Sequence, residues 1–144
     1  MKKLISLLLV CISMLMPASA FADEITVLVN GEQLVTDVAP QIVKDRTMLP
    51  MRAIFEALGA NVSWVEKDRL IFATKGEYMI VMQIDNNQMS VQTVTSDENT
   101  AISLDVAPFI YNSRTLVPVR AVAESLDAQV DWVAETRTVI INTK

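Results

Sequence analysis

Apolar and polar positions alternate along the first half of the chain in short runs that predict β-strands. Residues 25–29 and 32–35 are rich in β-forming side chains, and Asn30-Gly31 between them is the strongest two-residue signal for a hairpin. Residues 41–49 predict a second short hairpin that turns near its middle. The pattern before residue 50 is therefore that of paired antiparallel strands.

Helical spacing begins at Pro50, which fits the first turn of a helix because its missing N–H costs nothing there. The apolar positions of this predicted helix are Met51, Ile54, Phe55 and Leu58. Gly59 is a suitable left-handed stop, and two further strands are expected at residues 62–65 and 69–74. The whole pattern predicts an α+β fold, in which short antiparallel sheets pack around short helices.

Part of this pattern is written a second time, 68 residues later. Residues 37–40 recur as 105–108, and residues 46–53 lie over 114–121. Without a gap, 17 of 38 aligned positions are identical, far more than chance predicts. An offset kept over so many positions indicates an internal duplication.

The two predicted units cover about 25–76 and 77–144. Upstream the match loosens, and residues 27–31 correspond only loosely to 81–87. The second helix reaches Asp127 at its stop position, where we expect slight strain, because Asp tolerates left-handed geometry less well than Gly. A unit of this size buries little surface alone, so we expect the two units to share or interlock their cores.

The chain opens with a pattern typical of a secretory signal peptide. Lys2 and Lys3 precede an apolar run over residues 4–16, and small residues follow it. Cleavage is expected after Ala22, and an uncleaved anchor or a lipoprotein site at Cys11 is the weaker alternative. We therefore expect a secreted protein, extracellular or associated with the cell wall.

Removal of residues 1–22 changes the charge of the chain. The 12 basic and 17 acidic residues become 10 and 17, because Lys2 and Lys3 are lost, and the net charge falls to −7. An acidic chain without a basic run is a poor candidate for binding nucleic acid or an anionic membrane surface. The only cysteine, Cys11, also leaves, so the mature residues 23–144 form no disulfide.

The string Arg-Thr-Leu-Val-Pro-Val-Arg at residues 114–120, followed by 121–126 and 130–132, resembles the copper amine oxidase N-terminal-like domain, also called the stalk domain. The first unit carries the same signature with Met48 and Met51 as variants. The resemblance covers nearly the whole mature chain. It implies a small antiparallel sheet wrapped around a helix, in modules of secreted Gram-positive proteins that often stand beside wall-binding or hydrolase domains.

Oxidase chemistry does not accompany this resemblance. The oxidases bind copper through three histidines and form a quinone cofactor from a tyrosine, whereas this chain has no histidine. Its two tyrosines, Tyr78 and Tyr111, lie outside the cofactor-forming context. Nucleophilic triads and phosphate loops are missing too, and the acidic turns at 85–87 and 97–99 lack the spacing of a calcium loop. We predict no catalysis, no cofactor and no metal, although composition alone does not forbid a carboxylate pair for glycoside hydrolysis.

Recurring charged residues and tryptophans are the candidate site. They are Asp37, Arg46, Arg52, Glu56 and Trp64, with Asp105, Arg114, Arg120, Glu124 and Trp132. In the structural interpretation, which we favour for the charges, Arg52 pairs with Glu56 four residues away, and Arg120 pairs with Glu124. Alternatively, Arg52 clamps a turn carbonyl or Asp37. In the functional interpretation these charges form a groove for an anionic or sugar partner.

The two tryptophans allow the same two interpretations. We expect Trp64 and Trp132 to pack on the helices, and exposed rings would instead be platforms for stacking on sugars. Five methionines fall on apolar faces and are expected in the core, namely Met48, Met51, Met79, Met82 and Met89.

Three functions are compatible with this sequence. The first is a non-catalytic binding module at the bacterial cell envelope, with a wall polymer or a surface protein as partner and no membrane contact after cleavage. The second is a structural protein that oligomerises through exposed edge strands. The third, a regulator or inhibitor of a secreted enzyme, has no residue that argues for it.

Overall fold

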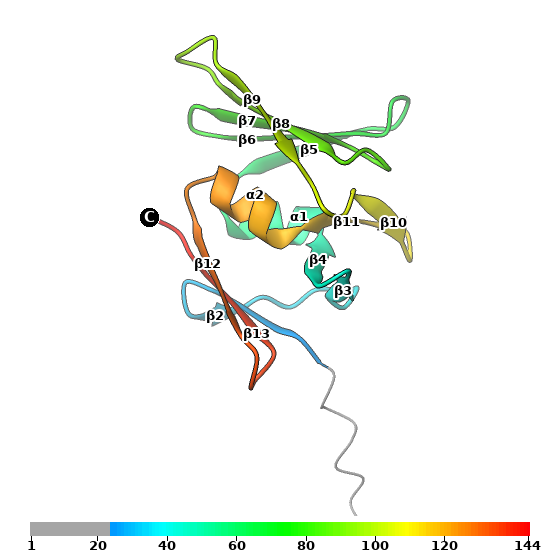
Figure 1. Cartoon of the computed structure of the whole chain (residues 1–144), viewed down its shortest axis with the longest axis vertical. Helices are drawn as coiled ribbons and strands as arrows, with labels where there is room; N and C mark the ends of the chain where they lie inside the picture. Colours follow the sequence, from blue (N-terminus) through cyan, green and yellow to red (C-terminus); the bar gives the residue numbers. More distant parts are fainter. Residues whose placement is uncertain (1–23) are drawn as a thin grey trace, which may run out of the picture.

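Two short helices lie among three β-sheets in the computed structural model of the chain, which describes residues 24–144 (Figure 1). In Figure 1 the helices lie between the sheet that ends in β9 and the sheet that contains β12 and β13. The predicted signal peptide at residues 1–22, with its cleavage site after Ala22, lies outside the described residues.

The first sheet has the order β12-β13-β1-β2, formed by Gln129–Val133, Thr138–Asn142, Thr26–Val29 and Glu32–Gln33. The second sheet has the order β10-β11-β4-β3, formed by Phe109–Tyr111, Arg114–Pro118, Arg46–Pro50 and Gln41–Val43. The third sheet has the order β5-β6-β7-β8-β9, formed by Asn61–Val65, Leu70–Lys75, Tyr78–Gln83, Gln88–Thr93 and Asn99–Ser103. The helices are α1, Met51–Ala57, and α2, Val119–Ser125.

The first predicted hairpin is confirmed. β1 and β2 pair as antiparallel strands, and the two turn residues Asn30 and Gly31 have φ angles of 50° and 83°. A left-handed conformation at both positions is what a type I′ hairpin turn requires, and Asn and Gly adopt it readily. The Asn30 side chain also donates to Thr143 Oγ1 at 2.9 Å. The turn is thereby tied to the end of the chain.

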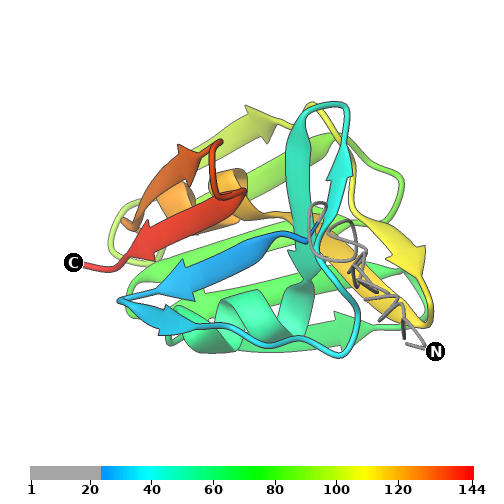
Figure 2. The same cartoon turned by 90° about the horizontal axis from the view of Figure 1, so that it is seen from below.

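β1 also makes a pairing that the local pattern did not predict. It lies parallel to β13, with Val27 opposite Val139 and Val29 opposite Ile141. Figure 2 shows these two strands side by side, the first in blue and the last in red. The beginning and the end of the described chain therefore belong to one sheet.

The predicted helix is confirmed as α1, but Pro50 is not in its first turn. Pro50 ends β4 with extended backbone angles, φ −53° and ψ 127°, and α1 begins one residue later. The reason is that Pro50 also pairs with Leu116 across the second sheet, which keeps it in a strand conformation. Gly59 follows the C-terminal end of α1 with a left-handed φ of +78°, as expected. Asp127 has φ +61° at the equivalent position after α2.

The centre of the second sheet is the pair β4 and β11. Leu49 lies opposite Val117, while Met48 faces Pro118 and Pro50 faces Leu116. Leu49 and Val117 are 68 positions apart, so the register is unchanged when the two strands are exchanged. The strands are thus related by a local two-fold axis through this pair.

Residues 78–103 form a three-stranded meander that the sequence pattern did not predict. The loose correspondence of residues 27–31 with 81–87 does not hold in the sheets. β1 and β2 end the first sheet where β8 and β9 end the third, and β7 is an additional strand between β6 and β8. β7 is apolar, like β1, and lies beside β6 as β1 lies beside β13, but it is antiparallel to this neighbour, whereas β1 is parallel to β13.

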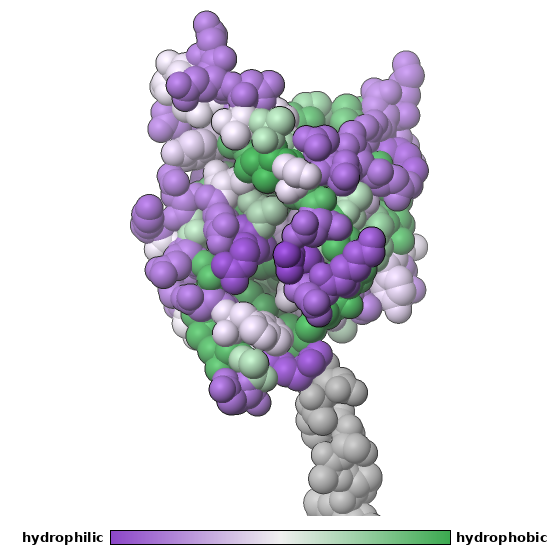
Figure 3. All heavy atoms as spheres, in the orientation of Figure 1, coloured by the Kyte–Doolittle hydropathy of each residue, from purple (hydrophilic) through white to green (hydrophobic). Residues whose placement is uncertain are grey.

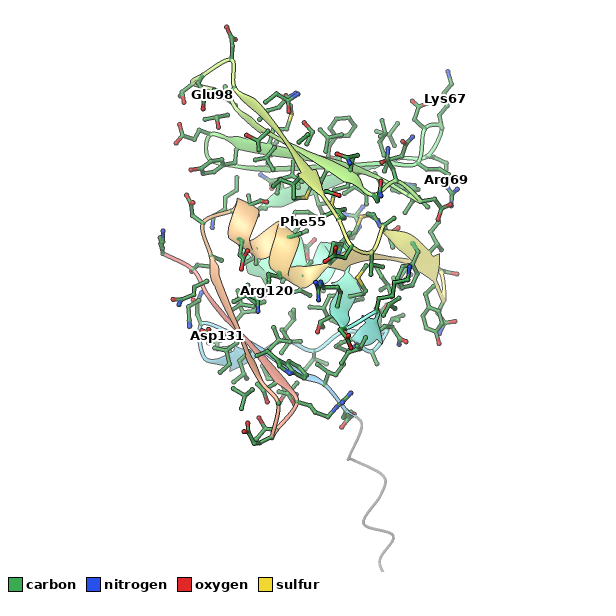
Figure 4. All side chains as sticks on the ribbon, viewed as in Figure 1. Phe55, Lys67, Arg69, Glu98, Arg120 and Asp131 are labelled. Atoms are coloured by element: carbon green, nitrogen blue, oxygen red, sulfur yellow. The ribbon has the colours of Figure 1, made fainter. Side chains whose placement is uncertain are left out.

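One large hydrophobic cluster joins both helices and all three sheets. It contains Leu49, Phe55, Ile80, Val122 and Ile141, each inaccessible to solvent. Phe55 lies in the middle of the molecule in Figure 4. The described fold is therefore mostly β-sheet, largely antiparallel, with two short helices.

Four of the five methionines predicted in the core are buried there, namely Met48, Met51, Met82 and Met89, whereas Met79 is only partly buried. Within residues 24–144 no helix is long and apolar enough to cross a membrane.

Candidate functional site

The candidate residues line two grooves on the surface. Groove one has a volume of about 850 Å³ and is defined by Arg46, Asp105, Arg120, Glu124, Asp131 and Trp132. Groove two has a volume of about 800 Å³ and is defined by Asp37, Arg52, Glu56, Trp64 and Arg114. All ten recurring residues predicted from the sequence lie in one of these two grooves.

The two grooves are built from equivalent positions. Of the residues that line groove two, all except Ala57 have a counterpart 68 positions away that lines groove one. Each groove takes four of its recurring residues from one half of the chain and a single arginine from the other half. These arginines are Arg46 in groove one and Arg114 in groove two, at the first positions of β4 and β11.

Reciprocal ion pairs join the two halves at the grooves. Arg46 donates through Nε and Nη2 to Asp105 Oδ2 at 2.9 and 2.6 Å. Arg114 donates through Nε to Asp37 Oδ2 at 2.8 Å, and its Nη2 lies 2.6 Å from the same oxygen. The two recurring aspartates thus pair with recurring arginines, and each of these two pairs crosses from one half to the other.

One of these pairs shifts the ionisation of its members. The Arg114 guanidinium bonded to Asp37 holds the pKa of that carboxyl below its ordinary value of 3.8, and the same bond raises the pKa of Arg114. Both side chains are half-exposed or more, at 50% for Arg114 and 57% for Asp37, so water and salt screen the attraction. The pair thus positions the groove wall more than it stabilises the fold.

The two pairs predicted along the helices differ. Arg120 Nη1 lies 3.0 Å from Glu124 Oε1 and also donates to the backbone oxygen of Val130 at 3.1 Å. Within residues 24–144, Arg52 forms no ion pair with Glu56, so that prediction is wrong for α1. An exposed pair four residues apart gains only a few tenths of a kcal/mol, about as much as the side-chain freedom it removes.

The alternative contact proposed for Arg52 is also absent from the described residues. Asp37, the carboxylate that Arg52 was expected to clamp, accepts from Arg114 instead. Arg52 is exposed on α1 at the wall of groove two.

The two tryptophans lie in different surroundings. Trp64 is partly buried against the large cluster, and its Nε1 donates to Glu66 Oε2 at 2.8 Å. Trp132 is 40% exposed in groove one and, unlike Trp64, is not among the residues packed against the large cluster. Alternation places Trp132 on the same side of β12 as the buried Val130, and both residues line groove one.

Groove one also contains acids that repeat-based reasoning missed. Asp45 and Asp131 line it, but the positions 68 residues away hold Ser113 and Ser63. A search for recurring residues does not find a side chain present in only one half. In Figure 4, Arg120 on α2 and Asp131 on β12 lie beside each other, and Figure 3 shows hydrophilic side chains around the middle of this face.

Groove one presents paired charged side chains next to an aromatic ring. Among residues 24–144, no group of three or more metal-ligating side chains is close enough to hold an ion. Two ion pairs, Arg46–Asp105 and Arg120–Glu124, lie in groove one beside the exposed indole ring of Trp132, and their oxygen and nitrogen atoms can form further hydrogen bonds. Such a wall offers flat polar groups and one stacking surface.

Comparison with known proteins assigns the family. The family model described as the copper amine oxidase N-terminal domain matches residues 28–141, which is more than half of the chain and confirms the resemblance inferred from the signature. No curated protein and no solved structure matches the chain. The chain belongs to the copper amine oxidase N-terminal domain family.

Proposed function

We propose that this protein is an exported, non-catalytic binding module of the bacterial cell envelope, and that its grooves bind the glycan of the wall. The observation that carries this proposal is the gathering of all ten recurring residues in two grooves. If these side chains only stabilised each half, there would be no reason for all of them to line surface grooves.

The chemistry of groove one favours a sugar over a strongly charged ligand. Trp132 offers a flat apolar ring, on which the C–H face of a sugar stacks. Arg46 and Arg120 are already paired with Asp105 and Glu124, so their charges are largely balanced. The groove also contains Asp45 and Asp131, whose carboxylates accept hydrogen bonds from hydroxyl and amide groups.

The sequence supports the proposed location. The charged start, the short apolar run and the small residues before Ala22 support export of the chain. An acidic protein without a basic run then has little attraction to anionic polymers or membranes, which favours a neutral glycan.

The reciprocal contacts also support duplication as the origin of the two grooves. Residues 68 positions apart make equivalent pairs across the β4–β11 axis, and both halves enter one cluster. We infer two duplicated units with interlocked cores, within one stalk-like domain over residues 23–144.

A pull-down on purified peptidoglycan sacculi tests this function. The wild-type protein is expected to bind, and Trp132→Ala to lose most of the binding because the stacking surface is removed. Tyr111→Ala is the matched control, since Tyr111 is an aromatic residue of similar exposure, 43%, outside both grooves. Equal binding by Trp132→Ala and wild type would contradict the proposal.

One observation favours a second candidate, a self-assembling structural protein. β10 is an edge strand of the second sheet and exposes Ile110 and Tyr111. An open edge with apolar side chains pairs readily with a strand of another copy. Sedimentation measures this directly: concentration-dependent oligomers that Ile110→Lys abolishes, together with no binding to sacculi, would favour self-assembly.

A further inference from the structure

We infer that the chain is bivalent: the two grooves are two forms of one glycan site, and a single molecule bridges two glycan strands. This inference rests on the proposed function and adds the number, placement and inequality of the sites.

Equivalent construction is the first argument. Each groove places an aspartate and an arginine from opposite halves against a second arginine, a glutamate and a tryptophan. The helix, the strand and the loop that supply these side chains occupy the same sequence positions, 68 residues apart. Since the same residue types line both grooves from the same kinds of element, we expect both grooves to bind the same class of ligand.

The placement of the grooves at different helices is the second argument. Groove one is walled by α2, and groove two is walled by α1. In Figure 2 the two helices lie on opposite sides of the molecule, and in Figure 1 α2 lies in front of α1. The two grooves share no lining residue and lie at different helices, so each can hold a strand of its own.

The two sites are not equally developed. In groove one the indole of Trp132 is exposed, while Arg120 is held by Glu124 and by the Val130 oxygen. In groove two Trp64 is partly buried with its N–H bonded to Glu66, while Arg52 is exposed and forms no ion pair within the described residues. Stacking thus dominates groove one, and hydrogen bonding from Arg52 dominates groove two, which is the weaker site.

A bivalent molecule acts differently from a single-site binder. Once groove one holds a strand, groove two meets neighbouring strands at the high local concentration of the wall. Even a weak second site then cross-links two strands, although it would not retain the protein by itself.

A sandwich experiment separates one site from two. Glycan strands are released from sacculi by an amidase, and part is fixed on beads while the rest is labelled and kept in solution. The purified protein is first measured for retention on the beads, and then for capture of the labelled strands. We expect the wild-type protein to do both.

Substitutions assign each step to a groove. Trp132→Ala is expected to reduce retention and capture together, whereas Arg52→Ala keeps most of the retention and lowers capture about tenfold or more. Trp64→Phe is a second groove-two variant that retains the packing of the ring, and Tyr111→Ala is the control outside both grooves.

The experiment distinguishes a failure of bivalency from a failure of glycan binding itself. Retention without capture of labelled strands shows a single site and overturns bivalency, while glycan binding stands. Capture that survives both Arg52→Ala and Trp64→Phe shows bridging by oligomers and also overturns it. If the wild-type protein is not retained at all, the proposed function and the inference fail together.

Discussion

At the scale of residues, the same side chain serves two purposes in the two halves. Trp64 is partly buried and hydrogen-bonded to Glu66, and Trp132 faces a groove. A partly buried indole stabilises the fold through the apolar area it covers, whereas an exposed one leaves that area available to a ligand. The two positions are therefore expected to respond differently to truncation.

Trp64→Ala should destabilise the protein more than Trp132→Ala does. Full burial of a tryptophan is worth about 3–5 kcal/mol, so the partly buried Trp64 should lose about 2 kcal/mol and Trp132 about 1 kcal/mol. Urea unfolding followed by circular dichroism measures both values. A larger loss for Trp132→Ala would mean that its ring contributes more to packing than its exposure indicates.

Tyr78 is expected to ionise late. Its hydroxyl donates to Asp127 Oδ2 at 2.9 Å, and this bond raises the pKa of Tyr78 above its ordinary value of 10.0, because the carboxylate opposes a second negative charge. The stability due to this bond is fully present below pH 10.0 and is lost as the pH rises through the higher folded-state pKa.

The measurement uses Tyr111→Phe, in which Tyr78 is the only tyrosine left of the two in the chain. Tyrosinate absorbance should rise with a midpoint above 10.0, and adding Asp127→Asn should lower the midpoint. Asn is chosen because it also tolerates the left-handed backbone at this position. An unchanged midpoint in the double variant would show that Asp127 is not the cause.

At the scale of elements, both helices stop at a residue with left-handed backbone. Gly59 has φ +78° and Asp127 has φ +61°. Glycine adopts this conformation without the steric cost that a Cβ atom brings. Both helices therefore end with the same backbone conformation, although the residue that adopts it is Gly after α1 and Asp after α2.

Gly59→Ala should destabilise the protein by about 1–2 kcal/mol through backbone strain alone. Nothing blocks the added methyl group, because the nearest atom is Lys75 Cε at 3.9 Å. Gly59→Asn should cost less, and urea unfolding of both variants measures the difference. Equal losses for Ala and Asn would point to a contact of the side chain instead of the backbone.

At the scale of the whole molecule, pairing between the halves determines how the chain folds. β1 lies along β13, β4 lies along β11, and residues of both halves fill one cluster. Neither half covers its own apolar surface, because each lacks a neighbouring strand that the other supplies. The described fold is thus expected to behave as one cooperative unit.

Calorimetry should show a single transition for residues 23–144, with calorimetric and van't Hoff enthalpies in agreement. An isolated fragment of residues 23–76 should be unfolded by circular dichroism, because β13 and β11 are missing from it. Two separate transitions, or a folded fragment, would show that the halves are independent domains.

Local signals in the sequence were sufficient for the local structure. Asn30-Gly31 predicted its hairpin, the spacing of Met51, Ile54 and Phe55 predicted α1, and the recurring charges identified the residues that line both grooves. Each of these depends on neighbours in the chain or on a repeat that is visible in the letters. The exposure of Trp132 depends on neither.

The sequence by itself determined which segments are strands and helices in the repeated part, the family signature and the set of recurring side chains. Only the tertiary structure decided the parallel pairing of β1 with β13, the extra strand β7, and the crossing of Arg46 to Asp105 and of Arg114 to Asp37. The physical reason is that alternation tells which side of a strand is apolar but not which strand lies beside it. Which strands become neighbours is determined by burial of the apolar surface of the whole molecule.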